Sequence, residues 1–307
     1  MEPLRILFMG TPHFAVSSLE VLIDSEYQIV AVVTAPDKPQ GRGRKLVASP
    51  VKVCAQKHRI PLLQPTNLKA PEFISELYEY NANLQVVVAF RMLPEVVWSM
   101  PSKGTFNLHA SLLPKYRGAA PVHWAVINGE RETGVTTFFI KHEIDTGSII
   151  LQEPEPIHQN DTTGSLTERL MTSGAKLVLK TVQTIERDDY QLAPQDLNTE
   201  LPKAPKLFKE HCLIDWNQDA AKIVNFVRGL NPFPTAWTEV GGIIYKIYQV
   251  EAIEEIEMQA NKPGAYKTDG HSYLLFKSSD GVVSVNELQA PGKRKMSIEE
   301  FLRGNKL

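Results

Sequence analysis

Cysteine is scarce in this 307-residue sequence, which holds only Cys54 and Cys212. Two cysteines this far apart predict neither a disulfide framework nor a cysteine metal site, and the scarcity favours a reducing cytoplasm. Long apolar runs are also missing. The longest, such as residues 86–90, are strand-sized, whereas a membrane-spanning helix needs about 20 apolar residues. The start of the chain has one early base and a short apolar run broken by Gly10 and Pro12, which does not match a signal peptide.

No charge of one sign dominates the sequence. Thirty-three basic and 35 acidic residues give a net charge of −2, so the basic footprint of many nucleic-acid-binding proteins is absent. Local basic patches can still steer an acidic partner. Two such patches stand out, one within residues 36–47 and one near the C-terminus: Lys38, Arg42, Arg44 and Lys45, and Lys293, Arg294 and Lys295. Taken alone, each fits a solvated loop as well as a nucleic-acid contact.

Several signatures of cofactor and covalent chemistry are also missing. Pro12 occupies the position where a dinucleotide fingerprint has its second glycine, so NAD binding is not expected. No Walker sequence and no H-E-x-x-H occur, and Cys54 and His58 have no third ligand nearby, so no metal is expected. Ser111 lacks the Gly-x-Ser-x-Gly context of a nucleophilic serine.

Apolar runs alternate with helical periodicity over the first 189 residues. Unbroken apolar strands that alternate with helices predict an α/β fold around a parallel sheet covered on both faces. The predicted strands include residues 4–9, 29–34, 62–63, 84–90, 105–108, 133–140 and 148–152, and the predicted helices include residues 51–58, 71–80 and 162–186.

The pattern changes after a proline-rich, polar stretch at residues 190–206, which is typical of an interdomain linker. Beyond it, short β-like runs with glycine turns predict a small barrel, OB-like in type. These runs are residues 236–240, 243–250, 272–276 and 282–288. We therefore predict a catalytic domain over residues 1–189 and a second domain over residues 207–307.

Polar side chains gather where the predicted strand at residues 105–108 ends. Asn107 and His109 are two residues apart, so their side chains leave the same face of the strand. Open α/β sheets bind ligands at the carboxyl ends of their strands. Asp145 precedes a glycine turn, and a carboxylate near an imidazole can orient it. An amide that can donate to an oxyanion, beside an oriented imidazole, suits acyl transfer without a covalent enzyme intermediate.

Residues 107–151 closely resemble the formyltransferases that use 10-formyltetrahydrofolate. The family pattern is N-x-H, S-L-L-P, R-G-A-x-P and D-x-G, which stands here at Asn107-x-His109, residues 111–114, residues 117–121 and Asp145-x-Gly147. Other segments are similar to the branch of the family that formylates methionyl-tRNA, namely residues 9–15, 34–52, 230–237 and 290–297. The resemblance covers both predicted domains.

This resemblance implies a Rossmann-like formyltransferase domain with a mostly parallel sheet, followed by a smaller OB-like domain that helps to bind tRNA. The formyl donor would be 10-formyltetrahydrofolate, without a metal. The positions that match its binding pocket are Ser111, Leu112, Leu113, Pro114, Val88 and Phe90. Phe90-Arg91-Met92 departs from the Tyr-Gly of many relatives, so we expect the rim of the pterin pocket to differ here.

The resemblance also implies initiator methionyl-tRNA as the partner of a cytoplasmic monomer. The basic loop at residues 37–46 matches the family loop that contacts the acceptor end, with Arg42 as its arginine. Lys38, Arg44 and Lys45 of the same loop and the cluster Lys293, Arg294 and Lys295 are the other expected tRNA contacts.

We interpret the chain as an enzyme in which Asn107 donates to a tetrahedral oxyanion. His109, held by Asp145, would stabilise it or supply a proton, and Asp145 would move the proton to the leaving amine. One alternative is a formyltransferase for a small amine, such as a sugar nucleotide or a purine precursor, which the second domain and the basic loop disfavour. A non-catalytic RNA-binding module is disfavoured because all three polar residues are present.

Overall fold

The computed structural model describes residues 3–40, 45–253, 258, 262–305 and 307. The chain divides into two units. The first contains Met1–Gly118, Thr133–Glu155 and Thr167–Pro202, and the second contains Ala119–Glu132, Pro156–Leu166 and Lys203–Leu307. Two short segments of the N-terminal sequence therefore belong to the second unit, and most of the proline-rich stretch belongs to the first.

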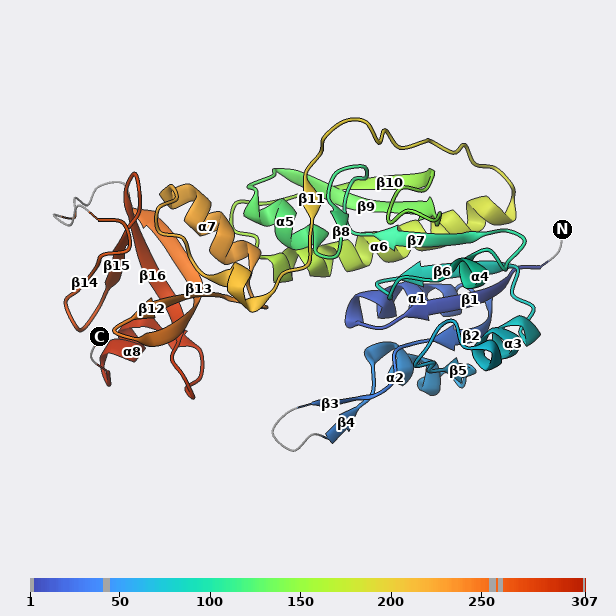
Figure 1. Ribbon diagram of the computed structural model, residues 1–307, viewed down its shortest axis with the longest axis horizontal. Helices are drawn as coiled ribbons and strands as arrows, with labels where there is room; N and C mark the ends of the chain where they lie inside the picture. The colour runs from blue at the N-terminus through green and yellow to red at the C-terminus, as the bar shows by residue number, and fades with distance from the viewer. Residues whose placement is uncertain (1–2, 41–44, 254–257, 259–261, 306) are drawn as a thin grey trace. The chain divides into compact units, whose positions relative to one another are not determined.

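A seven-stranded sheet forms the centre of the first unit (Figure 1). Its order is β10-β9-β7-β6-β1-β2-β5. The strands are β1 (Arg5–Gly10), β2 (Gln28–Val33), β5 (Leu62–Leu63), β6 (Leu84–Val88), β7 (Thr105–His109), β9 (Glu132–Phe139) and β10 (Ile149–Pro156). From β5 to β7 neighbouring strands are parallel, and β9 then runs antiparallel to β7. The predicted α/β class with a mostly parallel sheet is confirmed.

The burial of the central strands explains their apolar sequences. All five residues of β6 are buried, and residues 6–9 of β1 are fully buried. Strands covered on both faces cannot alternate polar and apolar residues, so they appear as continuous apolar runs. The strand order reverses between β1 and β6, and ligands of such sheets bind beyond the carboxyl ends of the strands.

Helices pack against this sheet. They are α1 (Val16–Asp24), preceded by the 3-10 turn η1 (His13–Ala15), α2 (Pro50–Lys57), α3 (Pro71–Glu79), α4 (Glu95–Trp98) and α6 (Thr163–Glu186). Helix α2 matches the helix predicted over residues 51–58. Its N-cap is Ser49, whose hydroxyl accepts from the Lys52 backbone N–H at 3.0 Å, and Pro50 is its first residue. Helix α6 runs unbroken through Gly174, where a Cβ would lie 2.9 Å from Leu108 Cδ2. This glycine therefore lets α6 approach β7 closely.

The basic stretch after β2 forms a hairpin of β3 (Lys38–Gln40) and β4 (Lys45–Val47), where the sequence had predicted a loop. Figure 1 shows this hairpin projecting from the first unit. Asp37 fixes its base by accepting from Lys52 Nζ at 2.7 Å and from Gln64 Nε2 at 2.9 Å. The hydrogen bond from Lys52, and then that from Gln64, lowers the pKa of Asp37. The hairpin thus leaves the sheet from an anchored base.

The second unit contains a six-stranded antiparallel half-barrel, as expected for a small barrel domain (Figure 1). Its strand order is β12-β13-β16-β15-β14, with β17 paired to β16. The elements of this unit are α5 (Pro121–Ile127), β11 (Lys203–Ala204), η2 (Lys209–Cys212), α7 (Ala220–Gly229), β12 (Ala236–Val240), β13 (Ile243–Ile253), β14 (Tyr266–Thr268), β15 (Leu274–Lys277), β16 (Val282–Gln289), β17 (Met296–Ser297) and α8 (Ile298–Leu302).

The core of this unit is aromatic as well as aliphatic. Trp216 stacks on Phe276 with a ring separation of 4.2 Å, and its indole N–H donates to Thr238 at 2.9 Å. The buried tryptophan therefore satisfies its one donor while it fills the barrel interior.

Within the described part of the chain, no helix has the length and apolar character needed to cross a membrane.

Candidate active site

Strand β7 presents Asn107 and His109 from the same face, because they are two residues apart in a regular strand. Asn107 is half-buried between Val87 of β6 and Phe138 of β9. Among the residues that the structure describes, its carboxamide has no hydrogen-bond partner. A partly exposed amide that its own fold leaves unused can donate to a bound ligand.

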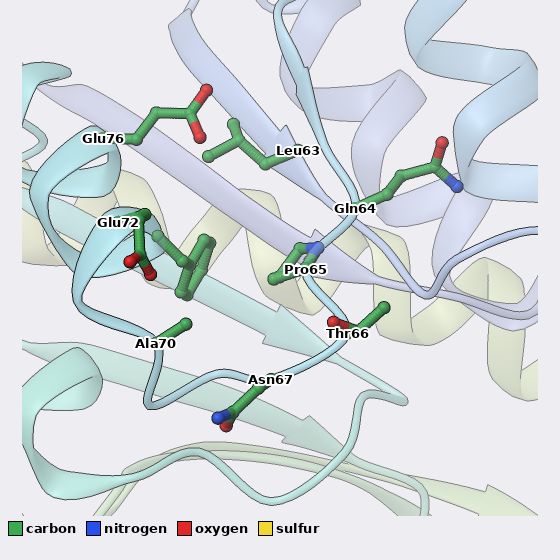
Figure 2. Close-up of a pocket in the computed structure, with 9 residues that line it drawn as sticks. Leu63, Gln64, Pro65, Thr66, Asn67, Ala70, Glu72 and Glu76 are labelled. Carbon is green, nitrogen blue, oxygen red and sulfur yellow. The ribbon is translucent and has the colours of Figure 1, made fainter.

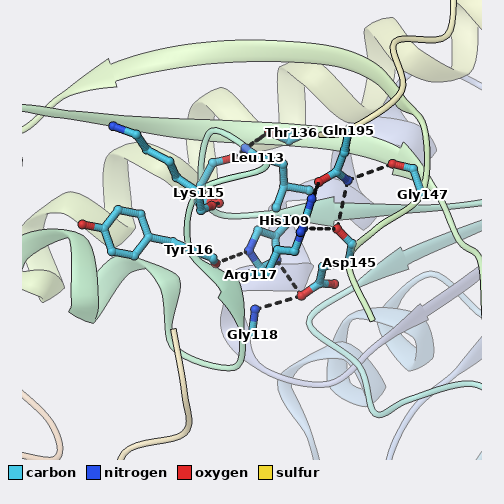
Figure 3. Close-up of polar contacts among 11 residues, drawn as sticks. His109, Leu113, Lys115, Tyr116, Arg117, Gly118, Thr136, Asp145, Gly147 and Gln195 are labelled. Atoms are coloured by element: carbon cyan, nitrogen blue, oxygen red, sulfur yellow. Dashed lines mark hydrogen bonds and ion pairs between the residues drawn. The ribbon is translucent and has the colours of Figure 1, made fainter. Parts of the chain in front are cut away.

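Burial and one hydrogen bond orient the His109 imidazole, which is only 6% exposed. Nε2 lies 2.9 Å from the carbonyl oxygen of Tyr116. A carbonyl oxygen can only accept, so Nε2 carries a proton. Nδ1 faces Asp145 Oδ2 at 3.9 Å (Figure 3). The hydrogen bond of Nε2 and the burial of the ring therefore point Nδ1 toward Asp145 before any substrate binds.

Asp145 stands on the loop between β9 and β10 with a φ of 55°, in the left-handed region. Its Oδ2 atom accepts from the Gly118 backbone N–H at 3.0 Å, and the Asp145 side chain is 14% exposed. Its backbone carbonyl accepts from Arg117 Nε at 3.2 Å and from Gln195 Nε2 at 2.9 Å (Figure 3). These donors hold the carboxylate toward His109.

Gly147 of the D-x-G pattern has a steric reason to be glycine. A Cβ at this position would lie 1.6 Å from the carbonyl oxygen of Phe139. The loop closes tightly here, since the Phe139 N–H also donates to Ser148 at 3.1 Å. The close approach of the two backbones places Asp145, two residues earlier, over the end of β7.

The segment after β7 is held from within. The Ser111 hydroxyl donates to the Lys115 carbonyl at 2.7 Å, so it is committed to the backbone. Thr136 Oγ1 accepts from the Leu113 N–H at 3.1 Å and donates to the Ser111 carbonyl at 2.6 Å (Figure 3). A cis peptide joins Leu113 to Pro114. These bonds give the Ser-Leu-Leu-Pro segment one defined backbone path.

The six positions that the sequence assigns to a folate pocket differ in exposure. The side chains of three are buried and those of the other three are partly exposed: Val88, Ser111 and Leu113 in the first group, and Phe90, Leu112 and Pro114 in the second. The second group can contact a ligand directly, whereas the first can only support it from behind. Folate binding at these positions stays a prediction.

Arg91, in the Phe90-Arg91-Met92 segment, ties two loops together. It donates from Nη1 to the Thr66 carbonyl at 3.0 Å and from Nη2 to the Pro65 carbonyl. Its guanidinium carbon also lies 5.5 Å from the centroid of the Phe90 ring. The loop after β6 is thereby joined to the loop after β5. That second loop borders a cavity of about 260 Å³, lined by Leu63, Gln64, Pro65, Thr66, Asn67, Ala70, Glu72, Phe73 and Glu76 (Figure 2).

Ala89, directly after β6, has a φ of 47° and is exposed. The left-handed conformation costs a non-glycine residue about 1–2 kcal/mol. Substitution by glycine removes that cost, but it also raises the entropy of the unfolded chain, which cancels part of the gain in stability. Ala89→Gly should therefore raise the free energy of unfolding by roughly 0.5 kcal/mol, measured by urea denaturation. Ala221→Gly, on an exposed face of helix α7, should lower it. Loss of stability in both variants would contradict the strain at Ala89.

The predicted tRNA contacts lie in both units. Lys38 is exposed on β3, Lys45 is on β4, and Arg42 and Arg44 fall outside the described residues. In the C-terminal cluster of Lys293, Arg294 and Lys295, each of the last two residues forms an ion pair with a glutamate. Arg294 pairs with Glu300, and Lys295 Nζ lies 2.7 Å from Glu287. The charge of this second patch is therefore partly compensated.

Comparison with known proteins identifies the family to which this chain belongs. Residues 4–182 match the formyl transferase family, and residues 206–306 match the formyl transferase C-terminal domain. The chain belongs to the formyl transferase family. Its reaction class is therefore formyl transfer, and the half-barrel is the C-terminal domain of that family.

Relatives match this formyl transferase over nearly its whole length. The methionyl-tRNA formyltransferase of Bacteroides fragilis is 51% identical over 311 residues, which cover 99% of this chain and 95% of that protein. The methionyl-tRNA formyltransferase of Flavobacterium johnsoniae is 47% identical, over 99% of this chain and 97% of that protein.

Solved structures share its fold at low identity. The N-formyltransferase of Helicobacter canadensis, in complex with folinic acid and dTDP-3-aminofucose, has a TM-score of 0.66 at 22% identity, covering 94% of this chain and 99% of that one. HypX of Aquifex aeolicus, in complex with tetrahydrofolic acid, has a TM-score of 0.64 at 22% identity, over 98% of this chain. The chain spans 47% of the length of HypX. At this identity the likeness shows the fold alone.

In this formyl transferase the site has one contributor that sequence reasoning missed. Gln195 lies in the proline-rich stretch, where no local pattern separates it from its polar neighbours. Arg117 and Gly118 were visible only as part of a family pattern, which gave no role for them. Their contacts join segments about 30 to 80 residues apart in the chain, as the contacts of Asp145 with Gly118 and of Gln195 with Arg117 show.

Proposed function

We propose that this chain transfers the formyl group of 10-formyltetrahydrofolate to the α-amine of methionine on initiator methionyl-tRNA, in the cytoplasm. The observation that carries the proposal is the identity of 51% to a methionyl-tRNA formyltransferase over 99% of this chain. Identity to the N-formyltransferase from Helicobacter canadensis, whose structure holds dTDP-3-aminofucose, is only 22%. The folate donor is supported by two structural neighbours, one in complex with tetrahydrofolic acid and one in complex with folinic acid.

The unused carboxamide of Asn107 is the oxyanion donor in this proposal. The methionyl nitrogen attacks the formyl carbon, and the formyl oxygen takes on negative charge in the tetrahedral state. Asn107 projects from the carboxyl half of β7, with a donor that no described residue occupies. A donor already in place stabilises that charge without reorganisation, which is worth about 3–4 kcal/mol when such a donor is removed.

In this proposal His109 helps to stabilise the negative charge of the tetrahedral state, and Asp145 transfers the proton. Because Nε2–H is bound to the Tyr116 carbonyl, a second ring proton would lie on Nδ1, facing Asp145 at 3.9 Å. The positive charge of the imidazolium so formed would stabilise the neighbouring oxyanion. As the bond from the formyl carbon to N10 breaks, one proton must pass from the methionyl nitrogen to N10. The Asp145 carboxylate, directly or through water, accepts and returns that proton.

The basic hairpin supplies the tRNA contact in this proposal. Its base is anchored through Asp37, and it carries exposed Lys38 together with Leu46, an apolar residue that is 70% exposed. Cations release counterions from a phosphate backbone, and an exposed apolar side chain can pack on an unpaired base. The hairpin therefore suits the end of a tRNA better than it suits a small amine.

Arg42→Ala should weaken use of methionyl-tRNA, with a rise in KM of about tenfold at low salt. It should also reduce the dependence of log(kcat/KM) on log[salt] by about one unit, since one phosphate contact is lost. Steady-state formylation at several salt concentrations measures both quantities. Lys180→Ala, an exposed lysine on helix α6, is the control and should change neither. Identical salt slopes for the wild type and Arg42→Ala would rule out the hairpin contact.

A transfer assay with labelled formyl donor tests the proposed function itself. Methionyl-charged initiator tRNA, the uncharged tRNA, an amino-sugar nucleotide and an aminated purine precursor are compared as acceptors. We expect label on the charged tRNA only, because the acceptor is the methionyl amine. Label on a small amine and none on the charged tRNA would instead support the small-molecule formyltransferase.

A further inference from the structure

One side chain of the proline-rich stretch is oriented toward the site. Between residues 191 and 200 Gln195 is the one half-buried residue, and all its neighbours in that range are exposed. An isolated β-bridge anchors the stretch just before it: Ile149 N donates to the Ala193 carbonyl at 2.8 Å, and Ala193 N to the Ile149 carbonyl at 3.0 Å. Because Ile149 begins β10, this bridge holds Gln195 beside the loop that carries Asp145.

The Gln195 carboxamide uses its full hydrogen-bonding capacity there. Its Nε2 donates to the carbonyl of Asp145 at 2.9 Å and to that of Gly147 at 2.8 Å. Its Oε1 accepts from Arg117 Nε at 3.0 Å and from Nη2 at 2.7 Å (Figure 3). Two donors and two acceptor sites are all that a carboxamide has. Such complete use restricts the amide to one orientation.

These contacts converge on Asp145 from two sides. Gln195 and Arg117 both donate to its backbone carbonyl, and Gly118, the neighbour of Arg117, donates to its carboxylate. The preceding residues 141–144 are exposed, so the side of the loop before Asp145 has little packing of its own. The orientation of the carboxylate toward His109 therefore depends on donors from outside the loop.

We propose that Gln195 is a positioning residue for formyl transfer. It bridges Arg117 to the Asp145–Gly147 backbone and so keeps the Asp145 carboxylate facing His109 Nδ1. The stretch at residues 190–202 thus completes the site rather than merely connecting domains. The kinetic consequence of this inference rests on the proposed function, whereas its structural consequence does not.

The test compares three variants of the full-length protein. Gln195→Ala removes every contact, and Gln195→Glu keeps the acceptor for Arg117 but loses both donors. Gln191→Ala changes an exposed glutamine of the same stretch and is the control. Each is assayed for kcat, for KM of methionyl-tRNA and of the formyl donor, and for melting temperature. The 1H and 15N signals of the His109 ring are recorded without substrate, as a readout that overall stability does not move.

We expect Gln195→Ala and Gln195→Glu to lower kcat roughly 10- to 100-fold, because displacement of a catalytic group by about 1 Å can cost that much. Both KM values should stay within about threefold of the wild type, since a positioning residue at 195 does not itself contact either substrate. The His109 ring signals should shift in both variants, and the melting temperature should fall by less than about 4 °C. Gln191→Ala should match the wild type throughout.

Wild-type kcat in Gln195→Ala, or unchanged His109 signals in that variant, would overturn the inference. A loss of kcat that follows the melting temperature and disappears on cooling would also overturn it, since the role would then be structural only. A wild-type protein that fails to formylate methionyl-tRNA would instead refute the proposed function. The His109 signals would still decide the positioning role in that case.

Discussion

Asn107→Ala should reduce kcat for formyl transfer by a factor of about 100 to 1,000, the usual cost of removing one oxyanion donor. The carboxamide of Asn107 has no hydrogen-bond partner among the described residues, so its removal disturbs no hydrogen bond among them. KM for methionyl-tRNA should change little, because the bond forms only in the tetrahedral state. Steady-state and single-turnover formylation measure both quantities.

Asn107→Asp is the matched variant for this prediction. It keeps the size of the side chain but replaces the donor by a carboxylate, which can only accept when ionised. Its kcat should fall at least as far as that of Asn107→Ala. Turnover within about threefold of the wild type in either variant would remove Asn107 from the mechanism.

Asp145→Asn should lower kcat by at least about 100-fold, the scale of proton transfer by a positioned group. The amide can still accept from the Gly118 N–H, so the loop should keep its path. It can neither pair with a charged His109 nor take up a proton. Thermal unfolding should therefore change little while the chemical step slows, which single-turnover kinetics separates from tRNA binding.

Asp188→Asn provides the control for Asp145→Asn. Asp188 also has a φ of 55°, and it is exposed at the end of helix α6. The same substitution in the same backbone conformation should leave kcat unchanged there. Equal rates for Asp145→Asn and Asp188→Asn would show that the Asp145 carboxylate has no part in the reaction.

The strands and most helices were predictable because their signals are local. Buried strands such as β6 require continuous apolar residues, and the N-cap Ser49 followed by Pro50 marks the start of α2. The hairpin of β3 and β4 was missed because its strands are only three residues long and their apolar residues, Leu46 and Val47, are exposed rather than part of a buried run. Its form depends on the bonds of Asp37 to Lys52 and Gln64, which the local sequence does not reveal.

The candidate site was predictable only where its signals, too, are local in the sequence. The spacing of Asn107 and His109 places both side chains on one face of any strand. By contrast, the contact of His109 with Asp145 depends on the path of a loop 36 residues later, which is closed by Gly147 against Phe139. Gln195 and Arg91 act through backbone carbonyls of distant loops. Carbonyls are present at every residue, so no pattern of side chains identifies such partners.

The central claim is that Asn107 meets the reacting formyl oxygen beside the pair of His109 and Asp145. A crystal structure with an unreactive analogue of 10-formyltetrahydrofolate tests it most directly. The formyl oxygen should lie about 3 Å from the Asn107 carboxamide nitrogen, with Asp145 still facing His109. A formyl group bound with no hydrogen bond to Asn107, in a pocket that His109 and Asp145 do not border, would contradict the account.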